Sequence, residues 1–231
     1  MYHSVYANVP ADYAVTPLQL ETDLEWLSQH GYTTVTAEAL WNYTNGIGTL
    51  PEKAVMITLD DGFYNNASEL LPLLQTYQMH AIVSVVGSYI ENQNDADAHH
   101  PQYSYLTWSD IRTLHDSGYV EIGNHTYDMH KLNGTRKGCR INQGESEEAY
   151  SAALSADLNL LQTSLHNNAG ITPVVFAYPY GFVCPESIPV LHDCGFLITL
   201  TCREAPNYIT RDPACLYGLG RYNRSGTYST A

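Results

Sequence analysis

The chain repeats one pattern of hydrophobic and polar positions, in which an amphipathic helix ends at a glycine and a short apolar strand follows. In the first copy, Leu20, Leu24 and Leu27 recur at the spacing of one helix face. Thr16-Pro17-Leu18-Gln19 predicts the helix start, because threonine and glutamine can form a capping box and proline suits the first turn. Gly31 predicts the end of the helix.

The same pattern recurs twice further along the chain. Thr107 predicts the start of a second helix, which ends at Gly118 directly before the strand that leads to His125. A third copy covers residues 187–194 and leads into an apolar run at residues 197–200. Both copies place an apolar strand immediately after a helix.

Two further units complete the series. Residues 65–78 are predicted as a helix bent by Pro72 and followed by a strand at 81–86, and residues 146–165 as a long helix before a strand at 174–177. Strands that alternate with helices predict a parallel sheet, either open or closed into a barrel. In a barrel enzyme the active-site residues lie at the carboxyl ends of the strands.

Two adjacent carboxylates, Asp60 and Asp61, end the apolar run that starts at Val55. Their charges repel unless a cation or a shared proton relieves them, which suggests one carboxylate on a metal ion and the other as a base. Gly62 follows, and Asp-Gly is also common turn chemistry after a strand. The pair alone leaves both interpretations open.

A second strand-end run carries His125 and His130. With Asp60 or Asp61 they would form a site of two histidines and one carboxylate, which leaves metal positions open for water and substrate, as a catalytic metal requires. On a regular helix a spacing of five residues would put the two rings on different faces. The ligands are therefore expected on a strand end and the turn after it.

Composition narrows the class of protein. The 231 residues suit one α/β domain, expected to cover residues 1–231. A net charge of −14, from 10 basic and 24 acidic residues, argues against nucleic acid or an anionic membrane as partner. A neutral or cationic substrate fits better. The 19 tyrosines and three tryptophans include aromatic faces on which sugar rings can stack, although most are expected in the core.

No apolar run is long enough to cross a bilayer, and no charged and apolar leader is present. Because the chain begins almost directly in a strand-like segment, an upstream signal or anchor is expected to have been removed. The five cysteines show no CxxC pair, and their odd number leaves the disulfide state open.

The strand-end motifs, in this order, resemble the polysaccharide deacetylase (NodB-homology) domain of carbohydrate esterase family 4, over nearly the whole chain. The run Thr58-Leu59-Asp60-Asp61-Gly62 resembles the first motif. This resemblance implies that Asp60 is the catalytic base and Asp61 a metal ligand. His125-Thr126 and His130 resemble the second motif, which implies that both histidines complete the metal site. Their spacing of five looks more like the poly-N-acetylglucosamine deacetylase branch than like most members.

The run Tyr178-Pro179-Tyr180-Gly181 resembles the third motif, and the resemblance implies that the backbone N–H of Tyr180 helps to bind the oxyanion. The chain departs from the family pattern at three places. Ala177 stands where an arginine usually braces the catalytic aspartate, and Arg221 or Arg224 could supply that charge instead.

The late histidine that serves as general acid in the family is missing from residues 197–202. His3, at the end of the first strand, is the best positional substitute, with a histidine merely packed at the barrel rim as the alternative. The tryptophan-containing fourth motif is not identifiable, so no substrate contacts carry over.

The resemblance implies a distorted (β/α) barrel of about seven parallel strands and a monomeric, metal-dependent N-deacetylase. Its substrate would be an N-acetylglucosamine-containing polysaccharide of the cell envelope, reached outside the cell and without membrane contact by this segment. The metal would be one divalent ion, with zinc expected first and cobalt, nickel or manganese as alternatives.

Three alternatives remain. An O-acetyl esterase acting on acetylated xylan and a non-catalytic sugar-binding relic of the fold both stay open. A glycoside hydrolase fits poorly, because its two carboxyls must lie about 5 Å or more apart on opposite sides of the scissile bond.

Overall fold

The computed structural model describes residues 1–6 and 10–230. The strands are β1 (Ser4–Val5), β2 (Ala14–Val15), β3 (Thr33–Thr34), β4 (Ala54–Val55), β5 (Ile57–Leu59), β6 (Ala81–Val85), β7 (Val120–Asn124), β8 (Val175–Ala177) and β9 (Ile198–Leu200). The α-helices are α1 (Pro17–Gln29), α2 (Ala37–Thr44), α3 (Leu71–Tyr77), α4 (Gly87–Glu91), α5 (Trp108–Asp116), α6 (Glu147–Ala169) and α7 (Ser187–Asp193).

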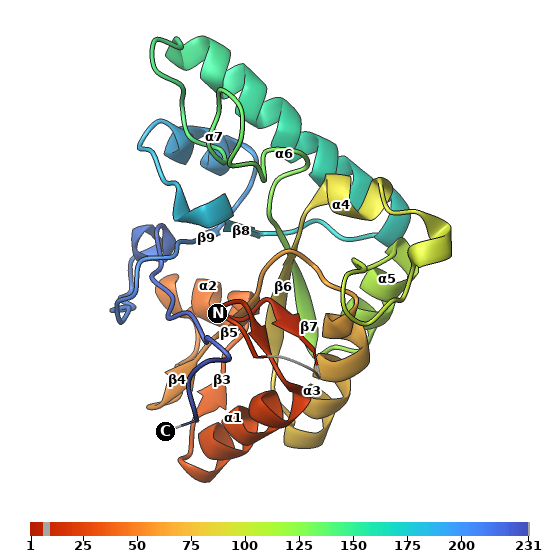
Figure 1. The fold of residues 1–231 in the computed structure, drawn as a ribbon. Helices are drawn as coiled ribbons and strands as arrows, with labels where there is room; N and C mark the ends of the chain where they lie inside the picture. Colours follow the sequence, from red (N-terminus) through yellow and green to blue (C-terminus); the bar gives the residue numbers. More distant parts are fainter. Residues whose placement is uncertain (7–9, 231) are drawn as a thin grey trace.

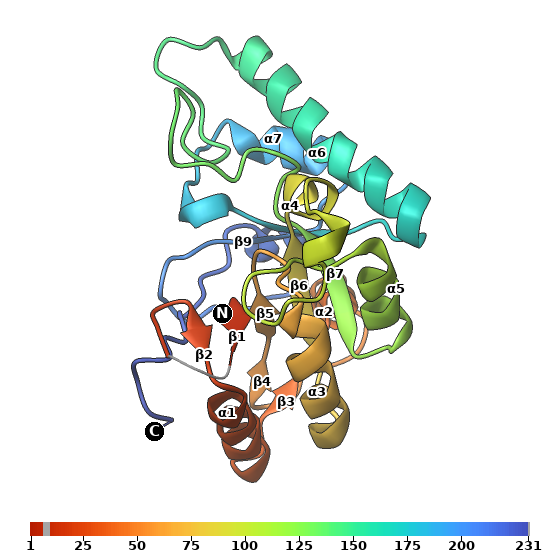
Figure 2. The same cartoon turned by 45° about the vertical axis from the view of Figure 1, so that its right-hand side comes forward.

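A parallel sheet in the order β5-β6-β7-β8-β9 forms the centre of the molecule (Figure 1), and β1–β2 and β3–β4 form two small parallel pairs (Figure 2). The α/β class with parallel strands is confirmed. The predicted count of about seven strands is wrong, because the main sheet has five strands within the described residues. Two more segments add only single parallel bridges, Tyr2 to Leu59 at one edge and Leu219 to Leu200 at the other.

The two ends of the chain lie side by side and connect the two edges of the sheet. The amide of Arg224 donates to the Met1 carbonyl at 2.9 Å, and the Met1 amine donates to the Tyr222 carbonyl at 2.8 Å. In Figure 1 the blue C-terminal segment accordingly runs beside the N terminus. Isolated hydrogen bonds, rather than a full strand ladder, span this seam, so the five-stranded sheet closes into a distorted barrel only through these contacts.

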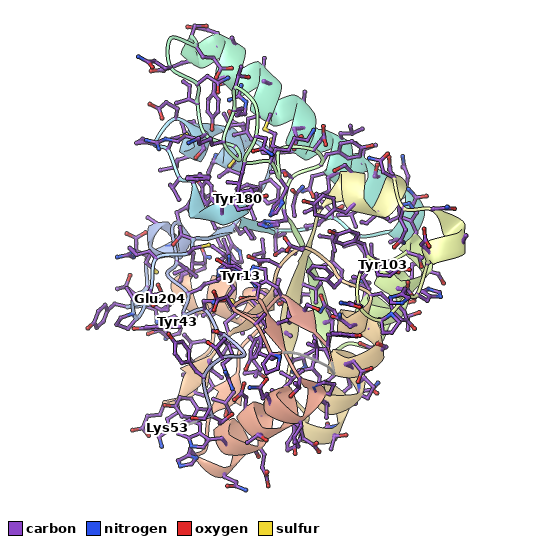
Figure 3. The ribbon with its side chains drawn as sticks, viewed as in Figure 1. Tyr13, Tyr43, Lys53, Tyr103, Tyr180 and Glu204 are labelled. Atoms are coloured by element: carbon purple, nitrogen blue, oxygen red, sulfur yellow. The ribbon has the colours of Figure 1, made fainter. Side chains whose placement is uncertain are left out.

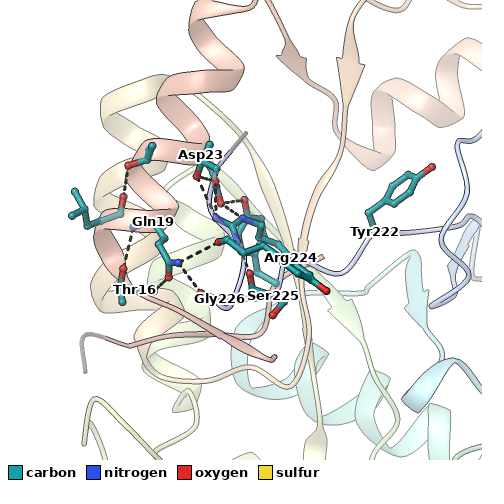
Figure 4. A network of polar contacts seen from close by, with 12 residues as sticks. Thr16, Gln19, Asp23, Tyr222, Arg224, Ser225 and Gly226 are labelled. Carbon is teal, nitrogen blue, oxygen red and sulfur yellow. Dashed lines mark hydrogen bonds and ion pairs between the residues drawn. The ribbon is translucent and has the colours of Figure 1, made fainter. Parts of the chain in front are cut away.

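Figure 4 shows a polar cluster that fastens the C-terminal segment to α1. The carboxylate of Asp23 accepts from Arg224 Nε at 2.7 Å and from the Tyr2 hydroxyl at 3.0 Å. Gln19 Nε2 donates to the Gly226 carbonyl at 2.8 Å. Arg224, one of the two arginines considered as partners of Asp60, is therefore paired with Asp23.

Local sequence signals account for several helix starts. Thr16 Oγ1 accepts from the Gln19 amide at 3.1 Å while Gln19 Oε1 accepts from the Thr16 amide at 2.9 Å, so the predicted capping box is confirmed. Thr107 forms the same reciprocal pair at α5. A π-helical turn at Asn66–Leu70 precedes α3, where Pro72 occupies the first turn, so the predicted bend lies at this junction.

The helices pack in series: α1 contacts α3, the π-helical turn before α3 contacts α5, and the long helix α6 contacts α5 and α7, with α1 and α3 at the lower end and α6 and α7 at the upper end of the view in Figure 2. All five residues of β6 are buried. None of the described helices is long and apolar enough to span a membrane, and the five cysteines are all free thiols.

Candidate active site

The aspartate pair lies in a tight turn at the carboxyl end of β5. Asp61 has φ 74° and Gly62 has φ 70°, so two consecutive residues adopt the left-handed conformation that glycine tolerates and other residues rarely adopt. A Cβ atom on Gly62 would lie 2.9 Å from Val85 Cγ1, so the turn also needs the small residue sterically. Asp60 and Asp61 have different partners on either side of this turn.

Asp60 forms a two-pronged ion pair with Arg221. Arg221 Nη1 and Nη2 donate to Asp60 Oδ1 and Oδ2, each at 2.7 Å, and the side chains are only 5% and 3% exposed. Arg221 Nε also donates to the Thr201 carbonyl at 2.9 Å. Burial alone would raise the pKa of Asp60, but the guanidinium charge and its hydrogen bonds hold that pKa well below the usual range. Asp60 is therefore a carboxylate at neutral pH.

Asp61 faces the two histidines instead. Its Oδ1 lies 3.6 Å from His125 Nε2 and 3.2 Å from His130 Nε2, and one ligand atom from each residue lies within 4.8 Å of the others. Burial and the charge of Asp60 raise the pKa of Asp61 to about 7. Burial lowers the pKa of His125, and it lowers that of His130 to about 3.

Buried Asp61 Oδ1 forms no hydrogen bond within the described part of the chain. One unsatisfied carboxylate oxygen beside two neutral imidazole nitrogens is the donor set that a divalent cation accepts, so these residues fit a metal ion.

Both histidines are oriented through their other ring nitrogen. His125 Nδ1 lies 2.7 Å from the Ala177 carbonyl, which accepts the Nδ1 proton of the neutral ring, so Nε2 keeps its lone pair free. His130 Nδ1 lies 2.8 Å from the Tyr89 hydroxyl and 3.1 Å from the Tyr180 hydroxyl. Ala177, the position that departs from the family pattern, thus contributes its backbone carbonyl to this site.

His3 is brought to the site by the N-terminal segment. The Tyr2 amide donates to the Thr58 carbonyl at 2.8 Å and the Asp60 amide donates to the Tyr2 carbonyl at 3.1 Å, which fixes His3 next to the end of β5. Burial lowers the pKa of His3 to about 4, while the charge of Asp60 acts in the opposite direction. His3 Nδ1 is buried and without a hydrogen-bond partner among the described residues. The ring lies edge-on to Tyr13, with centroids 4.8 Å apart.

Tyr180 lies in the turn Pro179–Gly181, directly after β8, with φ 56°. Its ring centroid is 4.4 Å from that of His130, and the residue is 40% exposed. Figure 3 labels Tyr180 at this turn and Tyr13 on the N-terminal segment. The prediction concerned only the backbone N–H of Tyr180, and the structure adds a side-chain contact with a histidine of the site.

Sequence reasoning missed two aromatic residues at the site. The ring centroids of Tyr89 and Tyr105 lie 4.5 Å apart, and that of Phe63 lies 5.2 Å from Tyr105. Tyr89 follows the carboxyl end of β6, so the strand-end rule that selected the other residues could have selected it too. Tyr105 lies far from any strand end in the sequence, and no local signal indicates it.

The sequence profile that describes polysaccharide deacetylases matches residues 47–198. This match covers more than half of the chain, and the chain therefore belongs to the polysaccharide deacetylase family, a family of metal-dependent deacetylases.

Two curated relatives carry a more specific name. The poly-beta-1,6-N-acetyl-D-glucosamine N-deacetylase of Escherichia coli (strain K12) is 26% identical over 195 residues, which cover 77% of this chain and 29% of the relative. The protein of the same name from Staphylococcus aureus (strain MRSA252) is 25% identical over 187 residues, which cover 80% of this chain and 59% of the relative. The chain thus spans less than two thirds of either relative.

Solved structures agree on the fold. A de-N-acetylase from Aggregatibacter actinomycetemcomitans aligns with a TM-score of 0.81 at 26% identity, over 99% of this chain and 95% of the other. IcaB from Ammonifex degensii aligns with a TM-score of 0.79 at 24% identity, over 98% and 90% of the two chains. The predicted deacetylase-type fold is confirmed.

The raised pKa of Asp61 predicts how the stability of the metal-free protein depends on pH. The folded state holds this proton up to about pH 7, whereas an unfolded aspartate loses it near pH 4. Between these values Asp61 binds more protons in the folded state, so the contribution of this one group to the free energy of unfolding falls as the pH rises, by at most about 1.4 kcal/mol per pH unit. Asp61→Asn has no carboxyl group to titrate here, so this decrease in the free energy of unfolding should be absent from the variant.

We therefore expect the difference in free energy of unfolding between metal-free Asp61→Asn and the wild type to shift in favour of the variant from pH 4.5 to pH 7.5. Denaturant unfolding with a chelator present measures this difference. The same stability difference at both pH values would contradict the raised pKa. Added metal should reverse the order at pH 7.5, because a ligand that binds only the folded state stabilises it.

Proposed function

We propose that residues 1–231 form one catalytic domain that removes N-acetyl groups from an N-acetylglucosamine-containing polysaccharide. The observation that carries the proposal is the separation of the two aspartates: Asp61 faces His125 and His130, while Asp60 is kept ionised by Arg221. The two curated relatives named as poly-beta-1,6-N-acetyl-D-glucosamine N-deacetylases support this substrate class.

Asp61, His125 and His130 would hold one divalent metal ion. When bound, such an ion polarises the acetyl carbonyl and lowers the pKa of a water ligand toward neutrality. A set of one carboxylate and two imidazoles suits zinc first, and it also accepts cobalt, nickel or manganese.

Asp60 would act as the general base that takes a proton from the attacking water. A carboxylate held at a low pKa is a weak base, so its task is feasible only on a water that is already acidified. Arg221 is the positioning residue for Asp60, because its fixed fork orients both carboxylate oxygens. In most family members an arginine of the third motif provides this positive charge, whereas here Arg221 of the C-terminal segment would provide it.

The backbone N–H of Tyr180 would help to bind the oxyanion, a contact typically worth about 3 kcal/mol. His3 would deliver a proton to the leaving amine, since an amide anion cannot leave unassisted. With a pKa of about 4, His3 is neutral at pH 7, so it must first receive a proton, and the neighbouring charge of Asp60 favours its protonated form. The products would be acetate and a glucosamine unit.

A polysaccharide substrate places the reaction outside the cell or in the cell envelope, and we propose that the domain works there as a monomer. A net charge of −14 suits a product polymer that gains positive charge with each amine released. An O-acetyl esterase would instead release acetate from acetylated xylan and not from an N-acetylglucosamine oligomer, and a sugar-binding relic would release it from neither.

Substitution of the two aspartates should affect metal content and turnover differently. Asp60→Asn should retain the metal and lose nearly all turnover, because it removes the base but none of the three proposed ligands. Asp61→Asn should lose both, because it removes a ligand. Metal content by elemental analysis and acetate release from an N-acetylglucosamine oligomer measure the two effects. Equal metal loss in both variants would contradict this division of roles, and a metal-loaded wild type that releases no acetate from any acetylated substrate would favour the binding relic.

His3→Ala should discriminate between leaving groups. We expect it to slow deacetylation of an N-acetylglucosamine oligomer much more than hydrolysis of an activated aryl acetate, whose leaving group needs little protonation. Metal content should stay at the wild-type value. An equal loss on both substrates would mean that His3 shapes the pocket instead of donating a proton, and no loss on either would make it a packed histidine at the rim.

A further inference from the structure

Two tyrosine hydroxyls from different parts of the fold meet at one atom. Tyr89, on α4 after β6, places its hydroxyl 2.8 Å from His130 Nδ1. Tyr180, in the turn after β8, places its hydroxyl 3.1 Å from the same nitrogen. Both hydroxyls lie 3.5 Å from the His130 carbonyl, at the outer limit of a hydrogen bond, so Nδ1 is their closer partner.

The chemistry of the ring fixes the direction of these contacts once Nε2 is used as a ligand. His130 Nε2 faces Asp61 at 3.2 Å. A neutral imidazole that offers the Nε2 lone pair to a cation must carry its proton on Nδ1. Nδ1 then donates a single N–H, and the structure provides two tyrosine oxygens to accept it.

We propose that Tyr89 and Tyr180 are alternative positioning residues for His130. Each can accept the hydrogen bond from Nδ1–H and so fix the ring orientation that metal binding requires. The inference rests on the proposed function only in taking His130 as a ligand. Partners of this kind typically change metal affinity by about 10- to 100-fold when they are lost.

The two tyrosines differ in how firmly they are held. Tyr89 is partly buried and packs against Tyr105, with centroids 4.5 Å apart, and edge-on against His130. Tyr180 is 40% exposed and lies in a turn with a left-handed backbone. Tyr89 would therefore still accept the hydrogen bond from His130 Nδ1 if the Tyr180 ring moved to make room for a sugar. The His130 ring would then keep its orientation toward the metal.

The test is a double-mutant cycle on metal affinity, measured for Zn²⁺ by competition with a chromophoric chelator. Tyr89→Phe and Tyr180→Phe should each weaken binding by less than about threefold, because the remaining hydroxyl still accepts the hydrogen bond from Nδ1. The double variant should bind about 10- to 100-fold more weakly, far beyond the product of the single effects. Tyr105→Phe removes a hydroxyl from the same aromatic group and should leave the affinity unchanged.

Two outcomes overturn the inference: a double variant that binds Zn²⁺ like the wild type, or one single variant that shows the full loss by itself. The nitrogen NMR shifts of His130 in the Zn²⁺-loaded protein give a second readout, since the proton should stay on Nδ1 in both single variants. His125→Ala separates failure of the proposed metal site from failure of this inference. If His125→Ala retains Zn²⁺, the ligand set is wrong, whereas if it loses Zn²⁺ and the double variant does not, only the inference fails.

Discussion

The buried ion pair between Asp60 and Arg221 is the interaction on which the rest of the site depends. It joins the end of β5 to the C-terminal segment that closes the barrel, across 161 positions of sequence. Removing one partner of such a pair typically costs about 3–5 kcal/mol, because the other charge stays buried and unpaired. The pair also satisfies both oxygens of Asp60, so Asp61 is the carboxylate left to face the histidines.

This arrangement balances the charges of the site before any ion enters it. Asp60 and Arg221 cancel each other, and burial keeps His125 and His130 neutral. Asp61 is then the single carboxylate among the three candidate ligands, and a divalent ion held there would keep a net positive charge. In the proposed reaction that charge would favour ionisation of the attacking water and stabilise the oxyanion, while Asp60 would remain free to act as the base.

Local signals predicted those parts of the fold that depend on neighbouring residues. The capping box at Thr16, the helix start at Thr107 and the aspartates at the end of β5 follow from interactions within a few positions. The strand count could not be obtained in this way, because the segments at Tyr2 and Leu219 add only single bridges, which depend on the closed barrel.

Long-range partners were equally beyond local reasoning. The sequence indicates Arg221 or Arg224 as the charge beside Asp60, with Arg221 as the predicted site residue. The path of the C-terminal segment pairs Arg221 with Asp60 and Arg224 with Asp23. Tyr89 was overlooked although it follows a strand end, because its contact with His130 requires the turn after β7 to fold back toward α4.

The pH dependence of kcat/KM in Arg221→Met tests the central claim most directly, that Arg221 keeps Asp60 ionised while Asp61 and the histidines hold the metal. Without the guanidinium, burial should dominate and raise the pKa of Asp60. The acidic limb of the profile should then shift to higher pH by about one to three units. Metal content should stay near that of the wild type, and Arg221→Lys should shift the limb less. An unchanged acidic limb in a folded, metal-loaded Arg221→Met protein would contradict the account.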